Sequence, residues 1–158
     1  MTPGEIEERL RTLEDIEAIK NLQNEYLFYV LNRQWEEIPE FFTDDAGVWV
    51  STMEPARGKE EIRRLFTERI SKANAGKDRD GHFTVMPVIT VNGDRASAHW
   101  MIYIFIADPA TGAVTRYAQG RYDNEYVREN GGWKFSKLVY TNPWPLTPES
   151  LPRPEEWQ

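Results

Sequence analysis

Residues 82–107 read HFTVMPVITVNGDRASAHWMIYIFIA, and this stretch decides the fold. Asn92-Gly93 near its centre is the strongest short signal for a two-residue hairpin turn, because both residues tolerate a positive φ angle. β-Branched and aromatic residues are frequent on either side of the pair, as they are in strands. The stretch therefore predicts two antiparallel strands, residues 82–91 and 95–107.

The same pattern of strand and turn continues toward the C-terminus. A turn at residues 108–112 leads to a strand over 114–128, and Asn130-Gly131-Gly132 leads to a strand over 133–140. Three consecutive hairpins make an antiparallel meander.

The first 70 residues have helical spacing instead, with apolar residues every three or four positions. The expected elements are a long N-terminal helix, well packed from a capping box at Thr12 and Asp15, a short helix over 34–38, a turn at 44–47, a strand from 48 and a helix over 59–70. Helices before a sheet predict an α+β fold, here a cone in which a curved sheet wraps around the N-terminal helices and encloses a pocket.

The strand over 95–107 is apolar on both faces. Ala98, Trp100, Ile102, Ile104 and Ile106 alternate with Met101, Tyr103 and Phe105. A strand apolar on both faces is covered on both. One face is expected to line a cavity, and the other to pack on helices or on a partner subunit.

Composition excludes several classes of protein. A formal charge of −7 argues against nucleic-acid binding, and no apolar run is long enough to span a membrane. The chain has no cysteine, its N-terminus is polar, and a cytoplasmic location is expected. No metal-ligand spacing and no phosphate-binding glycine loop is present, so we expect neither metal nor cofactor. Residues 1–145 are expected to form one domain, and 146–158 a proline-rich extended tail.

Several segments resemble the SnoaL-like branch of the nuclear-transport-factor-2-like superfamily. They are residues 13–20, Tyr26 nine positions before Trp35, and residues 41–46, 81–83, 124–126 and 132–137. The branch includes scytalone dehydratase, bile acid 7α-dehydratase, γ-hexachlorocyclohexane dehydrochlorinase, a diarylpropane lyase and polyketide cyclases. The resemblance implies a cofactor-free lyase or isomerase, and a homo-oligomer with a trimer favoured and a dimer possible.

The resemblance also indicates the site. His82 lies where these enzymes keep their catalytic histidine, and Tyr26 matches their catalytic tyrosine. A histidine can remove a carbon-bound proton near neutral pH, and a buried phenol can hydrogen-bond a leaving hydroxyl or an oxyanion. Strand alternation and the resemblance together place further residues in the pocket: Val50, Trp100, Ile102, Ile104, Tyr122, Leu138, Tyr140 and Asn142. His99 is expected at the surface or at an interface.

One departure from the pattern bears on the chemistry. The relatives have a carboxylate five residues after the tyrosine, and this chain has Leu31 there. His82 is therefore expected to lack its carboxylate partner. The leading hypothesis is a lyase or isomerase acting on a hydrophobic, aromatic or polycyclic molecule, with His82 as acid and base and Tyr26 assisting. The alternatives are a non-catalytic small-molecule-binding module and a polyketide-type aldol cyclase, the latter with Asp44 as a candidate acid–base residue.

Overall fold

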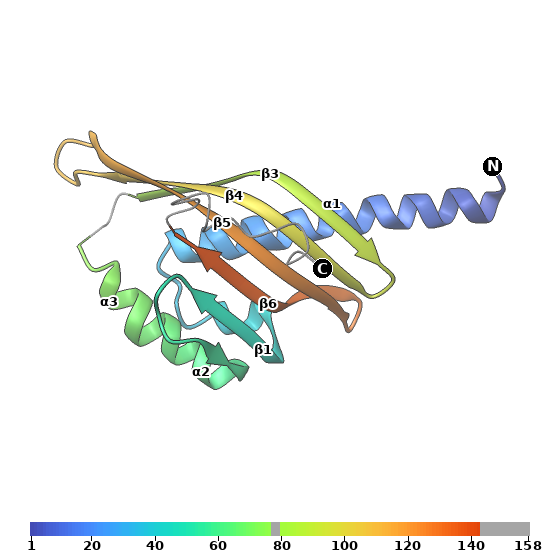
Figure 1. Cartoon of the computed structure of the whole chain (residues 1–158), viewed down its shortest axis with the longest axis horizontal. Coiled ribbons are helices and arrows are strands. Elements are labelled where there is room, and N and C mark those ends of the chain that lie inside the picture. The colour runs from blue at the N-terminus through green and yellow to red at the C-terminus, as the bar shows by residue number, and fades with distance from the viewer. Residues whose placement is uncertain (77–79, 143–158) are drawn as a thin grey trace, which may run out of the picture.

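A mixed, six-stranded curved sheet is the main layer of the computed structural model, which describes residues 1–76 and 80–142 (Figure 1). Its strands are β1 (Phe42–Val50), β2 (Ala56–Arg57), β3 (Asp80–Asn92), β4 (Arg95–Ala107), β5 (Val114–Glu129) and β6 (Gly132–Thr141). Their order is β2-β1-β6-β5-β4-β3, and β1 runs parallel to β6 while every other pairing is antiparallel. The predicted α+β class and the meander of β3 to β6 are confirmed.

The strand ends follow the predicted turns closely in the meander and poorly in β1. Gly93 has a φ of 62°, as the hairpin after Asn92 requires. The turn predicted at residues 44–47 is wrong, because these residues continue β1, where the register with β6 shifts between Phe42 and Gly47. A shift of this kind lets turn-forming residues remain inside a strand.

A single long helix, α1 (Pro3–Leu31), supplies the inner layer against which the sheet curves. Its capping box is Thr2 with Glu5 rather than Thr12 with Asp15, so the helix begins ten residues earlier than the expected well-packed start. Residues 1–14 are exposed, and this part of α1 projects beyond the sheet in Figure 1. Asn32 caps the C-terminal end of α1, where its backbone N–H reaches Phe28 O.

The short helix predicted over 34–38 is wrong. Turns occupy this region instead, and a 3₁₀ helix, η1 (Ile38–Phe41), follows them. Pro39 lies at the start of η1 rather than beyond a helix end, because proline lacks the N–H that the first turn of a helix leaves unused.

The helix predicted over 59–70 is present and longer. It consists of α2 (Gly58–Arg64), a π-helical segment η2 (Leu65–Ile70) and the short α3 (Ser71–Ala73), and it lies beside β1 (Figure 1). No helix in the described ranges is long and apolar enough to cross a membrane. The tail predicted for 146–158 lies outside the described residues.

The core lies between α1 and the inner face of the sheet. The Tyr26 ring is its centre, in edge-on contact with Phe42, Phe66 and Phe135 at centroid distances of 6.1, 6.2 and 5.5 Å. Asp15, predicted as a capping residue, is buried and fastens the middle of α1 to the sheet. It accepts hydrogen bonds from Arg128 at 2.5 Å and from the Trp133 indole at 3.1 Å.

Candidate functional site

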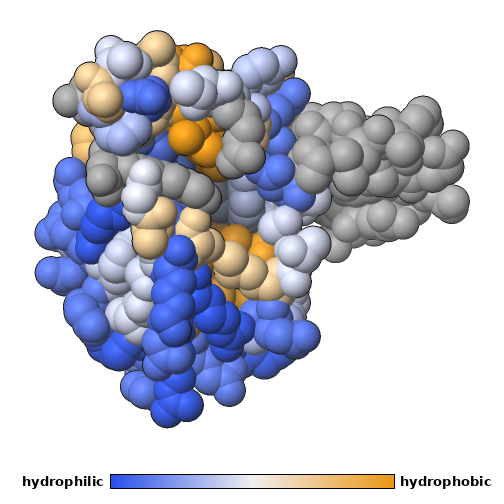
Figure 2. Space-filling model, turned by 90° about the vertical axis from the view of Figure 1, so that its left-hand side faces the viewer, coloured by the Kyte–Doolittle hydropathy of each residue, from blue (hydrophilic) through white to orange (hydrophobic). Residues whose placement is uncertain are grey.

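A cavity of about 210 Å³ lies between the C-terminal half of α1, η2 and the inner face of β3 to β6. Seven of the predicted site residues line it: Tyr26, Val50, His82, Ile104, Tyr122, Tyr140 and Asn142. Figure 2 looks at the end of the molecule where the β4–β5 turn and α3 lie, and hydrophobic side chains are visible in the recess between these elements. The cavity wall thus joins residues that are more than a hundred positions apart in the sequence.

Three residues predicted for the pocket lie elsewhere. Trp100, Ile102 and Leu138 do point inward, but they are buried in the core and do not line the cavity. The Trp100 indole donates to the Tyr126 hydroxyl at 3.2 Å, and Asn124 donates to Gln23 at 3.0 Å in the same buried network. Alternation along a strand gives the face of a residue but not its depth along the cone, and these residues lie beside the cavity instead of in its wall.

Eight lining residues were not predicted: Val30, Met53, Phe66, Ile70, Asn74, Asp80, Ile106 and Ala118. Phe66 and Ile70 come from the helical segment after β1. No local sequence pattern indicates how close this segment lies to the pocket. Ile106 continues the inward alternation of β4 and was within reach of that argument. Asp80 is the important omission.

Three tyrosine side chains, those of Tyr26, Tyr122 and Tyr140, line the cavity. Burial raises the pKa of Tyr26 far above its ordinary value, although a hydrogen bond with Tyr122 lowers it in part. Burial likewise raises the pKa of Tyr122, and that of Tyr140. Asn142 hydrogen-bonds the Tyr140 hydroxyl, and the Tyr122 and Tyr140 rings lie 5.3 Å apart. All three phenols therefore stay protonated at neutral pH. Because Tyr122 shares a hydrogen bond with Tyr26 and each phenol has a single proton to donate, Tyr26 and Tyr140 are the phenols that can donate to an oxygen in the cavity.

Gly120 makes room for this group of phenols. A Cβ atom at position 120 would lie 2.7 Å from the Tyr140 ring and 2.8 Å from Thr141 O. Because real Cβ atoms do not approach other atoms so closely, the glycine allows Tyr140 to lie flat against β5. The shape of this part of the cavity wall therefore depends on a glycine at position 120.

His82 does have a carboxylate partner, contrary to the expectation drawn from Leu31. Asp80 Oδ2 lies 3.3 Å from His82 Nε2, and Asp80 Oδ1 accepts a hydrogen bond of 2.6 Å from Arg33. Asp80 is two positions before His82 on β3, so both side chains are on the inner face. The sequence Asp80-Gly81-His82 indicates this pair, because residues two apart on a strand share a face. The expectation drawn from the relatives concerned the helix position of Leu31 instead.

The lowered pKa of Asp80 indicates that His82, and not Asp80, is the base in this pair. Burial alone would raise the pKa of the Asp80 carboxyl, but hydrogen bonds from His82 and Arg33 outweigh it and hold the pKa below its ordinary value. The Asp80 side chain is only 4% exposed. An ionised carboxylate with a lowered pKa is a poor base, so proton transfer in this cavity falls to the imidazole.

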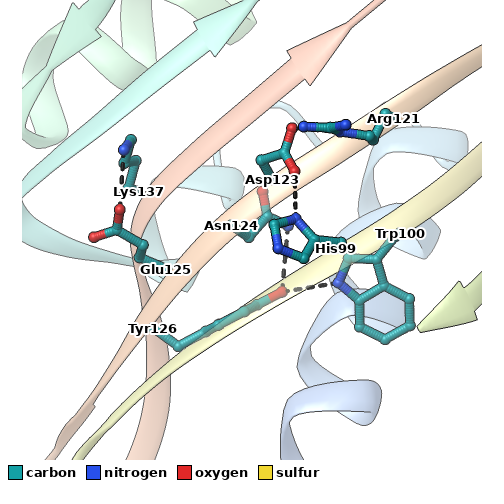
Figure 3. Close-up of polar contacts among 8 residues, drawn as sticks. All are labelled: His99, Trp100, Arg121, Asp123, Asn124, Glu125, Tyr126 and Lys137. Atoms are coloured by element: carbon teal, nitrogen blue, oxygen red, sulfur yellow. Dashed lines mark hydrogen bonds and ion pairs between the residues drawn. The ribbon is translucent and has the colours of Figure 1, made fainter. Parts of the chain in front are cut away.

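The second histidine lies on the opposite face of the sheet. His99 Nδ1 contacts Asp123, which also accepts a hydrogen bond from Arg121 at 2.7 Å (Figure 3). This agrees with the surface position expected for His99. The chain thus holds two histidine–aspartate pairs, one in the cavity and one on the outer face of the sheet.

Asp44 lies far from this chemistry. Its side chain is 94% exposed and pairs with Lys59 at 3.4 Å. It does not line the cavity, so the aldol cyclase alternative loses the residue on which it depended. Within the described residues, no group of three histidine, aspartate or glutamate side chains could hold a metal ion.

A long helix inside a curved mixed sheet, with a cavity between them, defines the nuclear-transport-factor-2-like class of fold. The family model for the SnoaL-like domain matches residues 11–139, and the chain belongs to this family. A comparison with curated proteins finds no match.

Solved structures agree on the fold. An NTF2-like protein with a cystatin-like fold from Novosphingobium aromaticivorans is 23% identical, covers 94% of both chains and has a TM-score of 0.76. A type 2 hexachlorocyclohexane dehydrochlorinase (LinA) is 22% identical over 92% of this chain and 98% of its own, with a TM-score of 0.72. A protein from N. aromaticivorans assigned as a scytalone dehydratase is 17% identical over 83% of this chain and 85% of its own, with a TM-score of 0.68. The distant relatives of this chain thus include lyases.

Proposed function

We propose that the protein is a cofactor-independent lyase or isomerase that acts on a hydrophobic, aromatic small molecule, with His82 as its acid and base. One observation supports this most directly: His82 lines the same apolar cavity as Tyr26, Tyr122 and Tyr140. A proton acceptor on one side of an apolar chamber and neutral hydrogen-bond donors on another suit an elimination next to a polarised C–O bond. The lyases among the distant structural relatives point the same way.

The proposed elimination needs no cofactor, because it transfers only protons and involves no change of oxidation state in the protein. In a dehydration, His82 takes the proton from a carbon, the C–H electrons form the new C=C bond, and the C–O bond of the neighbouring carbon breaks. The imidazolium then gives its proton to the departing hydroxide, so water leaves and His82 is neutral again. Tyr26 hydrogen-bonds the leaving oxygen without losing its proton, because burial keeps this phenol protonated.

The cavity volume limits the substrate. An apolar cavity of about 150 Å³ accommodates benzene. At about 210 Å³, this cavity accommodates a ring with substituents or a small bicyclic compound. We therefore propose a substrate of one or two rings that carries a hydroxyl or carbonyl group, and a larger polycyclic body would extend through the mouth.

The test is a panel of aromatic diols, hydroxy-ketones and halides incubated with wild-type protein, His82→Gln and Tyr26→Phe. We expect turnover by the wild type, a loss of about 10²–10⁴-fold in His82→Gln, and a smaller loss in Tyr26→Phe. His99→Gln is the matched control and should keep full activity. Tight binding with no turnover of any compound would contradict the proposal and favour a non-catalytic binding module.

We also propose that copies of the chain associate through the outer face of β3, β4 and β5, in a trimer rather than a dimer. Exposed apolar side chains lie next to one another there: Phe83, Val85, Val88, Phe105 and Tyr117. A contiguous exposed apolar patch on a folded protein usually marks an interaction surface. Val88 pairs with His99 across β3 and β4, and His99 pairs with Asp123 across β4 and β5, so this polar pair lies next to the patch.

A further inference from the structure

The first residue of β3, Asp80, brings a carboxylate to His82 that the helix does not supply. Asp80 and His82 are two residues apart on one strand face, while the helix position that carries the carboxylate in relatives is Leu31. The helix end contributes a cation instead: Arg33, with φ of 59°, follows the cap of α1 and donates to Asp80 at 2.6 Å. Arg33 is itself fixed by a hydrogen bond of 3.3 Å to Val30 O and by the Trp35 ring 5.6 Å away.

The two oxygens of Asp80 have separate partners. Oδ1 faces Arg33, and Oδ2 faces His82 Nε2 at 3.3 Å. An ionised carboxylate only accepts hydrogen bonds, so the nitrogen that faces it carries the proton in the neutral imidazole. The other nitrogen, Nδ1, is buried and has no hydrogen-bond partner among the described residues.

We propose that Asp80, held by Arg33, is the positioning residue that keeps His82 in the Nε2–H tautomer and so leaves the basic lone pair of the imidazole on Nδ1. This inference rests on the acid–base role proposed for His82. In this proposal a strand residue, Asp80, orients the imidazole. In the relatives the corresponding carboxylate lies on the helix, at the position of Leu31. Arg33 positions Asp80, and Asp80 positions His82. Asp80 itself does not contact the reacting atoms.

The chain offers an internal reference for the test. His82 and His99 are its only histidines, and each faces an aspartate. Asp80 faces Nε2 of His82, whereas Asp123 faces Nδ1 of His99 (Figure 3). With both imidazoles neutral, ¹⁵N NMR of the ring nitrogens should therefore show opposite tautomers, Nε2–H for His82 and Nδ1–H for His99. His99→Gln assigns the signals by leaving only those of His82.

Asp80→Asn should invert the tautomer of His82. Arg33 has only donors, so it attracts the amide oxygen and turns the amide nitrogen toward His82. That nitrogen donates to Nε2, which moves the ring proton to Nδ1 and the basic lone pair to Nε2. The matched control, Asp123→Asn, should alter the His99 signals and leave those of His82 unchanged.

The outcomes separate the inference from the proposed function. A wild-type His82 that is Nδ1–H or an even mixture overturns the inference, and so does a folded Asp80→Asn variant whose His82 signals do not change. The wild-type spectrum decides the point even if Asp80→Asn fails to fold, which its backbone amide spectrum would reveal. With a substrate in hand, Asp80→Asn should lower kcat by about 10²–10⁴-fold. The predicted tautomer without turnover of any compound would refute only the lyase.

Discussion

At the scale of single residues, Asp80 controls both the charge and the stability of the site. Its carboxylate is almost fully buried between a guanidinium and an imidazole, with distances of 2.6 and 3.3 Å. Burial opposes ionisation, and the two hydrogen bonds outweigh it, so the pKa of Asp80 in the folded protein is lowered. Through linkage, such a shift makes the folding free energy depend on pH.

The sign of this dependence can be tested. A lowered folded-state pKa stabilises the protein above the unfolded pKa, about 3.9 for aspartate, and the stabilisation is lost as the pH falls through the folded value. We expect Asp80→Asn to lower the free energy of unfolding at pH 7, and the gap to wild type to narrow as the pH falls below about 4. Urea unfolding at several pH values measures both. A gap that stays constant down to pH 3 would show that Asp80 is not preferentially ionised in the fold.

At the scale of elements, the position of β6 against β5 depends on Gly120. The backbone there lies close to the Tyr140 ring, and Tyr140 in turn approaches Tyr122 and hydrogen-bonds Asn142. A single absent side chain thus determines how three polar groups of the cavity are placed.

Substitution of two glycines by alanine tests this arrangement. In a strand, Gly→Ala ordinarily stabilises a protein by a few tenths of a kcal/mol or more, because the unfolded chain loses freedom. Gly120→Ala should instead lower the free energy of unfolding by about 1–3 kcal/mol, because Tyr140 and β6 must move. Gly132→Ala is the control, since its Cβ would meet nothing nearer than Glu129 O at 3.9 Å. Urea unfolding compares the two, and equal stabilities would contradict the steric role of Gly120.

The elements also show how far sequence reasoning reaches. The meander was predictable because each of its turns carries a local signal, such as Asn92-Gly93. The turn at 44–47 was predicted wrongly, because pairing of β1 with β6 overrides the local preference of its residues. The helix at 34–38 was also predicted wrongly, since turns and then η1 occupy this region. In the site, His82 and Tyr26 were found through the resemblance. Asp80 was missed because its partner Arg33 is 47 positions away, and only folding brings them together.

At the scale of the whole molecule, the two faces of the sheet differ in use. The inner face holds the core and the cavity, whereas the outer face exposes aromatic and aliphatic side chains, including Phe83 and Phe105 in edge-on contact at 5.5 Å. An exposed apolar face of this kind accounts for the association that we propose.

A pair of lysine substitutions tests the association. Val88 on the outer face and Phe28 on α1 are similarly exposed, at 62% and 64%. We expect the wild type to have a mass near three times the 18.5 kDa of one chain, and Val88→Lys to reduce it, because a buried charge without a partner disfavours an interface. Phe28→Lys should leave the mass unchanged. Light scattering after size-exclusion chromatography gives the masses, and a wild type that elutes as a single chain would refute the proposal.

The π-helical segment η2 has a consequence for how this cavity can change over time. A π turn contains one residue more than an α turn, and η2 places Phe66 and Ile70 in the cavity wall. Deleting one codon within the segment would restore α-helical register and rotate the residues on one side by about 100° relative to those on the other. The wall could then be remodelled in one genetic event, without any change to His82, Asp80 or the sheet. Descendants of a common ancestor could in this way acquire different substrates while keeping the same proton-transfer residues.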